Sequence, residues 1–305
     1  MRDLLALLSD SQFHSGEALG SQLGVTRAAI WKQLKKLEAI GVIVHSVKGR
    51  GYRLPQPVEL LSLDTMRALG LSPEMTSTLY FETDSTNLAL KRLLSKDAAL
   101  PMLVLAERQV QGKGRRGRDW QGGVAQNIML SFGWQFDAGT GAIEGLSLAV
   151  GVAVARVLRR LGVADLGLKW PNDVQVNGKK VAGVLLEMVA DNDVCQVIIG
   201  IGLNVRMPPD AMQEVTQPWT DLSQVLPTLP SRNQLVVDLT RELVAVCESF
   251  DRGRGLKDFS AEWQQQDVLL NQEVKVLSGN KTEFGIARGI DEKGALLLEE
   301  AAGLR

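Results

Sequence analysis

The sequence predicts an α+β protein with a helical N-terminal domain and a mixed, mostly antiparallel central sheet. Within residues 3–41, apolar residues recur at helical spacing on both sides of a short glycine-containing turn, which is the pattern of a helix-turn-helix. Farther along the chain, strand-like runs outnumber helical ones, and Asn177-Gly178 is a strong hairpin signal. Consecutive hairpins indicate a mostly antiparallel sheet with helices on one side.

Composition excludes several classes of protein. The chain has 305 residues, 45% of them hydrophobic and 23% charged, which is typical of a globular protein of two or three domains. It has only two cysteines, both in apolar runs, so a disulfide scaffold is excluded. Its two histidines, His14 and His45, lie near the N-terminus, which excludes a Ser-His-Asp triad or a multi-His metal site in the body of the protein. No apolar run approaches the ~20 residues of a membrane-spanning helix, so we expect a cytoplasmic protein without a membrane partner.

Three short helices are expected at the N-terminus. Residues 3–9 form an apolar helix, and Ser15 begins a second helix that ends at Gly24. Thr26 is a good N-cap for a third helix, which Gly41 ends. The helices and the turn between them predict a helix-turn-helix.

The third helix and the segment after it are strongly basic. Between Val25 and Leu54 there are seven Lys and Arg residues and one acidic residue, and such a concentration suits a polyanion. Residues 42–45 and 52–54 are expected to be two strands joined by a basic turn, the wing of a winged helix. A solvated helix face with a basic turn would explain the charge alone, and a winged helix can also serve as an interaction domain, but the spacing favours DNA binding. The residues expected to contact DNA are Thr26, Arg27, Ala28, Trp31, Lys32, Lys35, Lys48 and Arg50.

A stiff segment, Pro55-Gln56-Pro57, sets a domain boundary near residue 60, which separates an N-terminal domain (1–60) from a central domain (61–270). The strands expected in the central domain are 79–82, 103–108, 127–136, 166–170, 174–177, 180–189 and 194–205. The helices expected there are 85–95, 143–161, 231–251 and 256–266.

Residues 111–120 form a glycine-rich basic loop. The loop matches G-x-G-x-x-G, but the apolar helix of a dinucleotide-binding fold does not follow it, and it lacks the final Lys-Ser or Lys-Thr of a P-loop. Its four cations are Lys113, Arg115, Arg116 and Arg118. The glycines allow the backbone to close over an anion, which favours anion binding over a merely solvated basic loop.

A cation, a rigid turn and a carboxylate follow one another in the segment Lys169-Trp170-Pro171-Asn172-Asp173. The Asn-Gly hairpin is expected to return Lys180 to the neighbourhood of Asp173. A carboxylate that can bind a metal would then lie beside an ammonium that can bind phosphate. This arrangement suggests nucleotide chemistry, and a structural ion pair is the alternative.

Five motifs occur in a fixed order: Asp84-Ser85-Thr86-Asn87, Gly112–Gly117, Lys169–Asp173, Lys180–Gly183 and Gly200–Asn204. Together they resemble the biotin protein ligases that are also biotin operon repressors, and the likeness covers nearly all of the chain. The resemblance implies that biotin and MgATP give biotinyl-5′-adenylate and pyrophosphate. A lysine of the biotin carboxyl carrier protein of acetyl-CoA carboxylase then attacks the adenylate. It also implies that an adenylate-bound homodimer binds operator DNA and represses biotin synthesis genes.

The resemblance assigns roles to individual residues. Catalysis is expected of Arg115, Lys169, Asp173 and Lys180, and Asp173 is expected to bind Mg²⁺. The residues expected to bind biotin are Ser85, Thr86, Asn87, Gln109, Gly112, Gly114, Arg115, Arg116, Gly117, Lys180 and Gly183. The residues expected to bind the nucleotide are Arg118, Trp120, Asn172, Asn204 and Trp219. Helix capping is the alternative for Ser85 and Thr86, and loop packing is the alternative for Trp219.

The resemblance also implies a ligase domain like that of class II synthetases and a small SH3-like β-barrel over residues 271–305. Two features depart from the family. Lys113 stands where the family commonly has Arg, which keeps the charge but loses the bidentate fork. The sequence stops at Arg305, where relatives add a further turn and strand, so the last strand of the barrel is expected to be missing.

The basic loop is expected to be mobile without ligand, because three glycines and four cations offer no packing of their own. Arg115 is expected to face the phosphate and Arg116 a dimer surface. Two other functions fit parts of the sequence. A ligand-sensing repressor without ligase activity would not need Asp173 and Lys180, and a lipoate ligase of the same fold would not need the basic loop and the winged helix.

Overall fold

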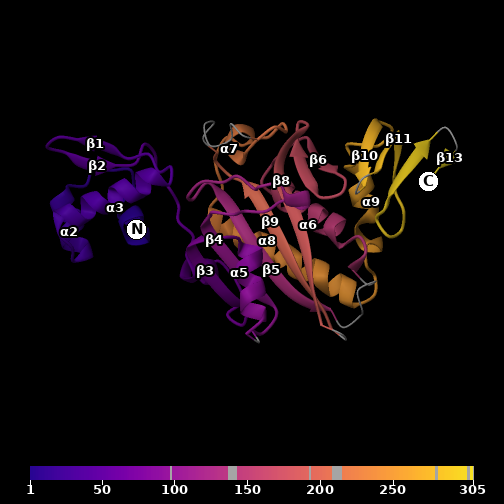
Figure 1. Cartoon of the computed structure of the whole chain (residues 1–305), viewed down its shortest axis with the longest axis horizontal. Coiled ribbons are helices and arrows are strands. Elements are labelled where there is room, and N and C mark those ends of the chain that lie inside the picture. The colour runs from indigo at the N-terminus through magenta and orange to yellow at the C-terminus, as the bar shows by residue number, and fades with distance from the viewer. Residues whose placement is uncertain are drawn as a thin grey trace.

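Over the residues that the structure describes, three sheets divide the chain into an N-terminal, a central and a C-terminal part. In the computed structural model these parts follow one another, so that the two ends of the chain lie on opposite sides of the central sheet (Figure 1). The residues that the structure describes are 1–96, 98–136, 143–191, 194–207, 215–278, 281–300 and 303–304. Within these ranges, no helix has the length and apolar character needed to cross a membrane.

The N-terminal part is the predicted winged helix. Its elements are α1 (Arg2–Leu8), α2 (Gly16–Leu23), α3 (Arg27–Ala39), β1 (His45–Val47) and β2 (Gly51–Arg53). Ser15 and Thr26 cap α2 and α3 as expected, because their side-chain oxygens accept backbone N–H groups of the first turn. The first wing strand begins later than predicted, since Val42 N still donates to Leu37 O and closes the end of α3.

The central sheet has seven strands in the order β3-β4-β5-β9-β8-β7-β6. β3 is parallel to β4 and every other neighbouring pair is antiparallel, which confirms the prediction of a mixed, mostly antiparallel sheet. The strands are β3 (Thr76–Thr83), β4 (Met102–Gln109), β5 (Asn127–Phe136), β6 (Leu166–Lys169), β7 (Asp173–Val176), β8 (Lys179–Asp191) and β9 (Val194–Asn204).

Helices cover both faces of this sheet, so the prediction of helices on one side only is wrong. Alternate residues of β4 point to opposite faces, so Leu103 belongs to a buried cluster with α6 and α8, and Val104 to a second cluster with α5. The α-helices of the central part are α4 (Leu63–Ala68), α5 (Thr86–Leu94), α6 (Leu146–Arg160), α7 (Leu222–Val225), α8 (Arg232–Asp251) and α9 (Lys257–Gln265). The position of α5 matters for function, because its N-terminus reaches the candidate site.

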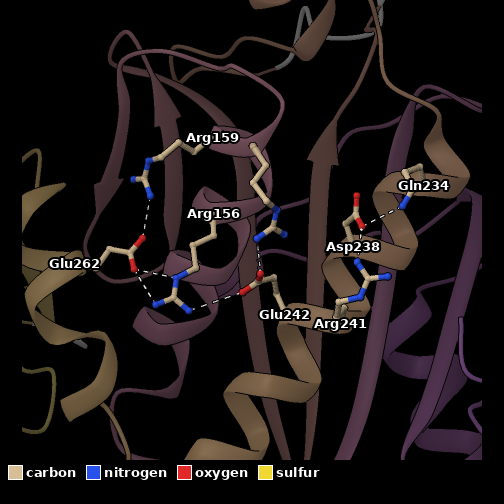
Figure 2. A network of polar contacts seen from close by, with 8 residues as sticks. Arg156, Arg159, Gln234, Asp238, Arg241, Glu242 and Glu262 are labelled. Atoms are coloured by element: carbon tan, nitrogen blue, oxygen red, sulfur yellow. Dashed lines mark hydrogen bonds and ion pairs between the residues drawn. The ribbon is translucent and has the colours of Figure 1, made fainter. Parts of the chain in front are cut away.

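Charged side chains join α6, α8 and α9 on their outer surface (Figure 2). Arg156 Nη2 lies 2.8 Å and Arg159 Nη1 2.9 Å from the carboxylate of Glu262 on α9. Burial raises the pKa of the Glu262 carboxyl, but the hydrogen bonds from Arg156 and Arg159 outweigh burial and lower this pKa overall. Arg160 pairs with Glu242 of α8 at 2.6 Å. These contacts fasten α9, which leads into the C-terminal part, to the rest of the helix layer.

The C-terminal part is an antiparallel sheet of β10 (Glu273–Ser278), β11 (Lys281–Ile290), β12 (Leu296–Glu300) and β13 (Gly303–Leu304). The prediction of a small β domain here is confirmed. Its last described strand is β13. Residues 301, 302 and 305 lie outside the described residues, so the expected absence of a final strand stays a prediction. Trp170 Nε1 donates to Gly294 O at 3.0 Å and so ties the rigid turn after β6 to this sheet.

Candidate active site

A pocket forms where the N-terminus of α5, the basic loop and the hairpin of β7 and β8 meet over β5 and β9. Most residues that the sequence assigns to biotin or nucleotide binding come together in its walls. Those that line the pocket are Ser85, Thr86, Asn87, Gln109, Gly114, Arg115, Trp120, Asn172, Lys180 and Gly183. Lys113, which departs from the family pattern, also lines it.

Polar side chains at the start of α5 are held by hydrogen bonds at the closed end of the pocket. Thr86 donates from its backbone N and its Oγ1 to Gln109 Oε1, at 2.6 and 3.0 Å. Asn87 Nδ2 donates to Glu187 Oε2 at 2.6 Å, and Asn87 Oδ1 accepts from Ser131 Oγ. The amide of Asn87 is therefore fixed in orientation, and it presents a polar surface that is almost entirely buried.

Ser85 does not act as a side-chain cap of α5, although it occupies the N-cap position. The preceding Asp84 takes over part of this role, because its Oδ1 accepts from Ser85 N at 2.7 Å. Arg92, farther along α5, approaches the same carboxylate with both terminal nitrogens, at 2.6 and 2.9 Å. The hydrogen bonds from Arg92 hold the pKa of the Asp84 carboxyl far below its usual range. The start of α5 is thereby fastened, which leaves the Ser85 side chain to face the pocket.

The basic loop is folded by its own backbone. Gly114 N donates to Arg118 O at 2.7 Å and Trp120 N donates to Gly112 O at 2.8 Å, so the loop closes as a small hairpin. The loop thus makes contacts within itself, although most of its residues are exposed, and its mobility without ligand stays a prediction. These hydrogen bonds hold Arg115 at the pocket wall, and burial together with the neighbouring Arg116 lowers the pKa of Arg115.

Arg116 turns away from the pocket. Its backbone is left-handed, with φ of 59°, and its Nη2 donates to Leu277 O on β10 of the C-terminal sheet. The structure therefore places this side chain on a neighbouring part of the same chain, which differs from its expected positions at biotin or at a dimer surface. Gly112, Gly117 and Arg118, also assigned to ligand binding, shape the loop but do not line the pocket.

The Lys180 and Asp173 side chains are brought together by a β-bulge. Asp173 pairs with Gly183, whereas Gln175 pairs with Lys180, so β8 contains one extra residue at this point. The extra residue reverses the alternation of faces, and Lys180 therefore lies on the same face as Asp173 and Gly183. Lys180 Nζ is 2.6 Å from Asp173 Oδ1, which matches the proximity predicted from the hairpin.

The remaining assigned residues surround this pair. Lys169 pairs in register with Asp173 across β6 and β7, is exposed and does not line the pocket. Asn172 Nδ2 donates to Val184 O at 2.7 Å. Trp219 is half-buried, and the residues on either side of it form hydrogen bonds with the backbone of Lys180. Asn204 is buried at the end of β9. Asn204 and Trp219 thus lie next to the pocket rather than in its wall.

On the winged helix, all residues assigned to DNA contact are exposed. Trp31 on α3 is 53% exposed although it is a large aromatic residue. At the wing, the guanidinium of Arg50 lies over the ring of Phe13, 4.2 Å from its centroid, which stiffens a long basic side chain. This surface offers a helix and a basic hairpin to a polyanion.

Family models match all three parts of the chain. The model described as the Biotin/lipoate A/B protein ligase family matches residues 79–204, which carry most of the pocket. A model described as HTH domain matches residues 1–53, and one described as Biotin protein ligase C terminal domain matches residues 269–305.

The chain is also similar to curated proteins over almost its whole length. It is 41% identical over 302 residues to the bifunctional ligase/repressor BirA of Escherichia coli, covering 97% of this chain and 91% of that protein. This chain belongs to the BirA family of bifunctional ligase/repressors. BirA of Bacillus subtilis is 31% identical over 314 residues, with 100% and 95% covered. The solved biotin protein ligase from Aquifex aeolicus in complex with biotin and ATP has a TM-score of 0.63 at 27% identity, with 75% of this chain and 94% of that chain covered.

Sequence reasoning missed several residues of this BirA-family pocket. Gly200 and Gly202 make room in it, because a Cβ at these positions would lie 2.5 Å from Asn87 Oδ1 and 2.3 Å from the Trp120 ring. Both belong to a motif noted in the sequence, but their role depends on side chains from distant segments. Ser131, a buried polar residue in the apolar strand β5, could have been noticed as an exception to the strand pattern.

Proposed function

We propose that this protein activates biotin with ATP and transfers it to the biotin carboxyl carrier protein of acetyl-CoA carboxylase. We further propose that it represses biotin synthesis genes as an adenylate-bound homodimer on operator DNA, and so works in the cytoplasm. The observation that carries the ligase proposal is the meeting of Lys180, Asp173 and Arg115 beside a pocket with a buried polar end. Family membership supports the same reaction.

We assign the two ends of biotin to different walls of the pocket. The buried amide and hydroxyl groups of Asn87 and Thr86 suit a small polar ring, and Trp120, which lies over Gly202, offers an apolar wall. The biotin carboxylate would then point toward Lys180 and Arg115. We assign Ser85 and Gln109 to biotin, and Asn172, Asn204 and Trp219 to the nucleotide.

Adenylation joins two anions, so charge neutralisation is the main task of the site. A biotin carboxylate oxygen attacks the α-phosphorus of ATP, the bond to the bridging oxygen breaks, and pyrophosphate leaves. Lys180 and Arg115 stabilise the charge on the carboxylate and the α-phosphate, and Lys169 lies on the same strand face to stabilise phosphate oxygens. The pocket is bounded by groups fixed before the reaction, so little reorganisation is required.

Asp173 is the residue that would hold Mg²⁺. Mg²⁺ is usually bound through one or two carboxylates together with substrate phosphates, and the half-buried carboxylate of Asp173 beside Lys180 is a ligand of this kind. When bound, the ion would neutralise phosphate charge. Asp173 also keeps the Lys180 ammonium in place, since their atoms are 2.6 Å apart.

The second step needs no nucleophile from the enzyme. The ε-amine of the carrier lysine attacks the acyl carbon of the adenylate, AMP leaves, and the amine loses a proton as the amide forms. The mixed anhydride is already activated, which fits a pocket without His or Cys in its walls. The chain's own contribution is to orient the acyl group and exclude water.

Detection of biotinyl-adenylate tests the choice between a ligase and a ligand-sensing repressor. The full chain is incubated with biotin and MgATP, and the products are measured by mass spectrometry. Biotinyl-adenylate and pyrophosphate should appear together, and only when both substrates are present. Tight biotin binding without adenylate formation would favour the sensor, whereas an adenylate formed with lipoate and not with biotin would favour a lipoate ligase.

A further inference from the structure

A buried ion pair lies behind the pocket, between the start of α8 and β4. Arg232 is 4% exposed and Glu107 is fully buried, and Arg232 Nη2 is 2.9 Å from Glu107 Oε2. Removing two charges from water costs free energy that their attraction often fails to return, so such a pair is weak evidence for stability. Neither residue lines the pocket. Their contacts point instead to a role in holding other groups.

The guanidinium of Arg232 fixes two segments of backbone. Its Nη2 donates to Asn127 O at 2.7 Å, and its Nη1 donates to Glu59 O at 2.6 Å. Glu107 completes the arrangement, because its Oε1 accepts from Leu61 N at 2.5 Å. The pair therefore connects two parts of the chain. One is the segment that follows the winged helix, and the other is the first residue of β5.

Asn127 links Arg232 to Asn204. The two residues face each other across β5 and β9, and Asn127 Nδ2 donates to Asn204 Oδ1 at 3.1 Å. Asn204 Nδ2 in turn donates to Thr220 O at 3.0 Å. A backbone carbonyl can only accept, so Thr220 O determines which end of the Asn204 amide faces it, and Asn127 then holds the other end.

The network ends at the lysine of the site. Thr220 N donates to Lys180 O at 2.9 Å, and this hydrogen bond borders Trp219. After these contacts, the Asn204 amide has one N–H and one oxygen lone pair left for a ligand. Asn127 is fully buried and Asn204 is 3% exposed, so a lost partner in this network is not readily replaced by bulk water.

We propose that Arg232 is a positioning residue for the nucleotide, which acts through Asn127 to fix the amide of Asn204. The inference rests on the proposed binding of ATP at Asn204. Arg232 does not touch substrate. Replacing Arg232 should weaken nucleotide binding and not biotin binding. Thr86 and Asn87 are held by hydrogen bonds with other residues, namely Gln109, Glu187 and Ser131.

The Arg232→Lys variant tests this directly in the full chain. Lysine keeps a positive charge beside Glu107 but cannot reach several acceptors with a planar fork. In biotin-dependent exchange of pyrophosphate into ATP, we expect the KM for ATP to rise ~10-fold, the usual scale for a lost hydrogen bond to a charged group. The KM for biotin should stay within about twofold of the unchanged protein.

The matched control is Arg241→Lys on the same helix, where an arginine that is 62% exposed pairs with Asp238. This variant should leave both KM values unchanged. In a folded Arg232→Lys protein, an unchanged KM for ATP, or equal rises in both KM values, would overturn the proposal. Absence of exchange in the unchanged protein would instead contradict the proposed function on which it rests.

A second variant covers the case in which Arg232→Lys fails to fold. Asn127→Ala leaves the buried ion pair and the carbonyl of residue 127 in place, and it should raise the KM for ATP selectively as well. If both variants fold, the KM for ATP of the double variant should be within about twofold of the KM of the worse single variant, because the two changes interrupt the same path. An Asn127→Ala protein with normal KM for ATP, or fully additive effects of the two changes, would refute transmission through Asn127.

Discussion

Lys180 and Asp173 share one face of the sheet only because β8 carries an extra residue between the partners of Val174 and Gln175. In a regular hairpin, Lys180 would point to the opposite face, away from the pocket. The bulge thus sets the 2.6 Å contact between ammonium and carboxylate, and it places Lys180 in the wall of the candidate site.

Replacing Lys180 should damage adenylation more than biotin binding. Lys180→Ala removes a cation where negative charge must be neutralised, and we expect adenylate formation to slow by ~10²-fold or more. Biotin affinity should change less, because the polar end of the pocket is intact. The control is Lys179→Ala, an exposed neighbour outside the pocket. A Lys180→Ala rate within about threefold of the unchanged protein would remove Lys180 from the active site.

The ion pair of Asp84 and Arg92 should make stability depend on pH. Arg92 lowers the folded-state pKa of Asp84, so its stabilisation is present above the unfolded-state pKa, about 4, and is lost as the pH falls through the folded-state pKa. Arg92→Met should therefore reduce the free energy of unfolding at pH 7. Urea denaturation between pH 7 and pH 3 measures the difference from the unchanged protein, which should shrink in the acid range. If the difference in free energy of unfolding stays constant between pH 7 and pH 3, the stabilisation does not come from the ionised Asp84 carboxyl.

The winged helix should bind DNA through separate phosphate contacts. Lys32→Ala and Arg50→Ala should each weaken operator binding and reduce the slope of log K against log salt by ~1. Lys257→Ala, an exposed change on α9, serves as the control. Removal of residues 1–60 should abolish operator binding. If the full chain shows no preference for operator over other DNA, the winged helix is an interaction module.

Ligand should strengthen dimerisation. A ligand can shift a monomer–dimer equilibrium only if it binds the two states with different affinity. The basic loop provides a means, because it joins the pocket through Arg115 to the C-terminal sheet through Arg116. Sedimentation should show tighter pairing with biotin and ATP than without them. Equal monomer–dimer association constants with and without biotin and ATP would mean that the DNA-binding domain is not coupled to the enzyme.

Local patterns made much of the fold predictable. Caps such as Thr26, the hairpin signal Asn177-Gly178 and the alternation within strands are set by neighbouring residues, and the structure agrees with each of them. The proximity of Lys180 to Asp173 also followed from the hairpin. The bulge that turns Lys180 to the correct face did not, since no local residue type marks it.

Long-range contacts account for what the sequence could not predict. Arg116 donates to the backbone carbonyl of Leu277, whereas the resemblance to the family implied a position at a dimer surface. The space left by Gly202 has meaning only once Trp120 lies over it. Likewise, Arg232 looked like part of a helix start, whereas its partners come from the linker, β4 and β5.

Transfer of biotin to a carrier domain is the decisive measurement of ligase activity. The full chain is incubated with biotin, MgATP and the carrier domain of acetyl-CoA carboxylase, and the mass of the carrier is followed. The carrier should gain one biotin on a single lysine, only in the presence of ATP, and this gain should be lost when that lysine is replaced by arginine. A carrier that stays unmodified while the protein binds both biotin and ATP would contradict the proposed ligase activity.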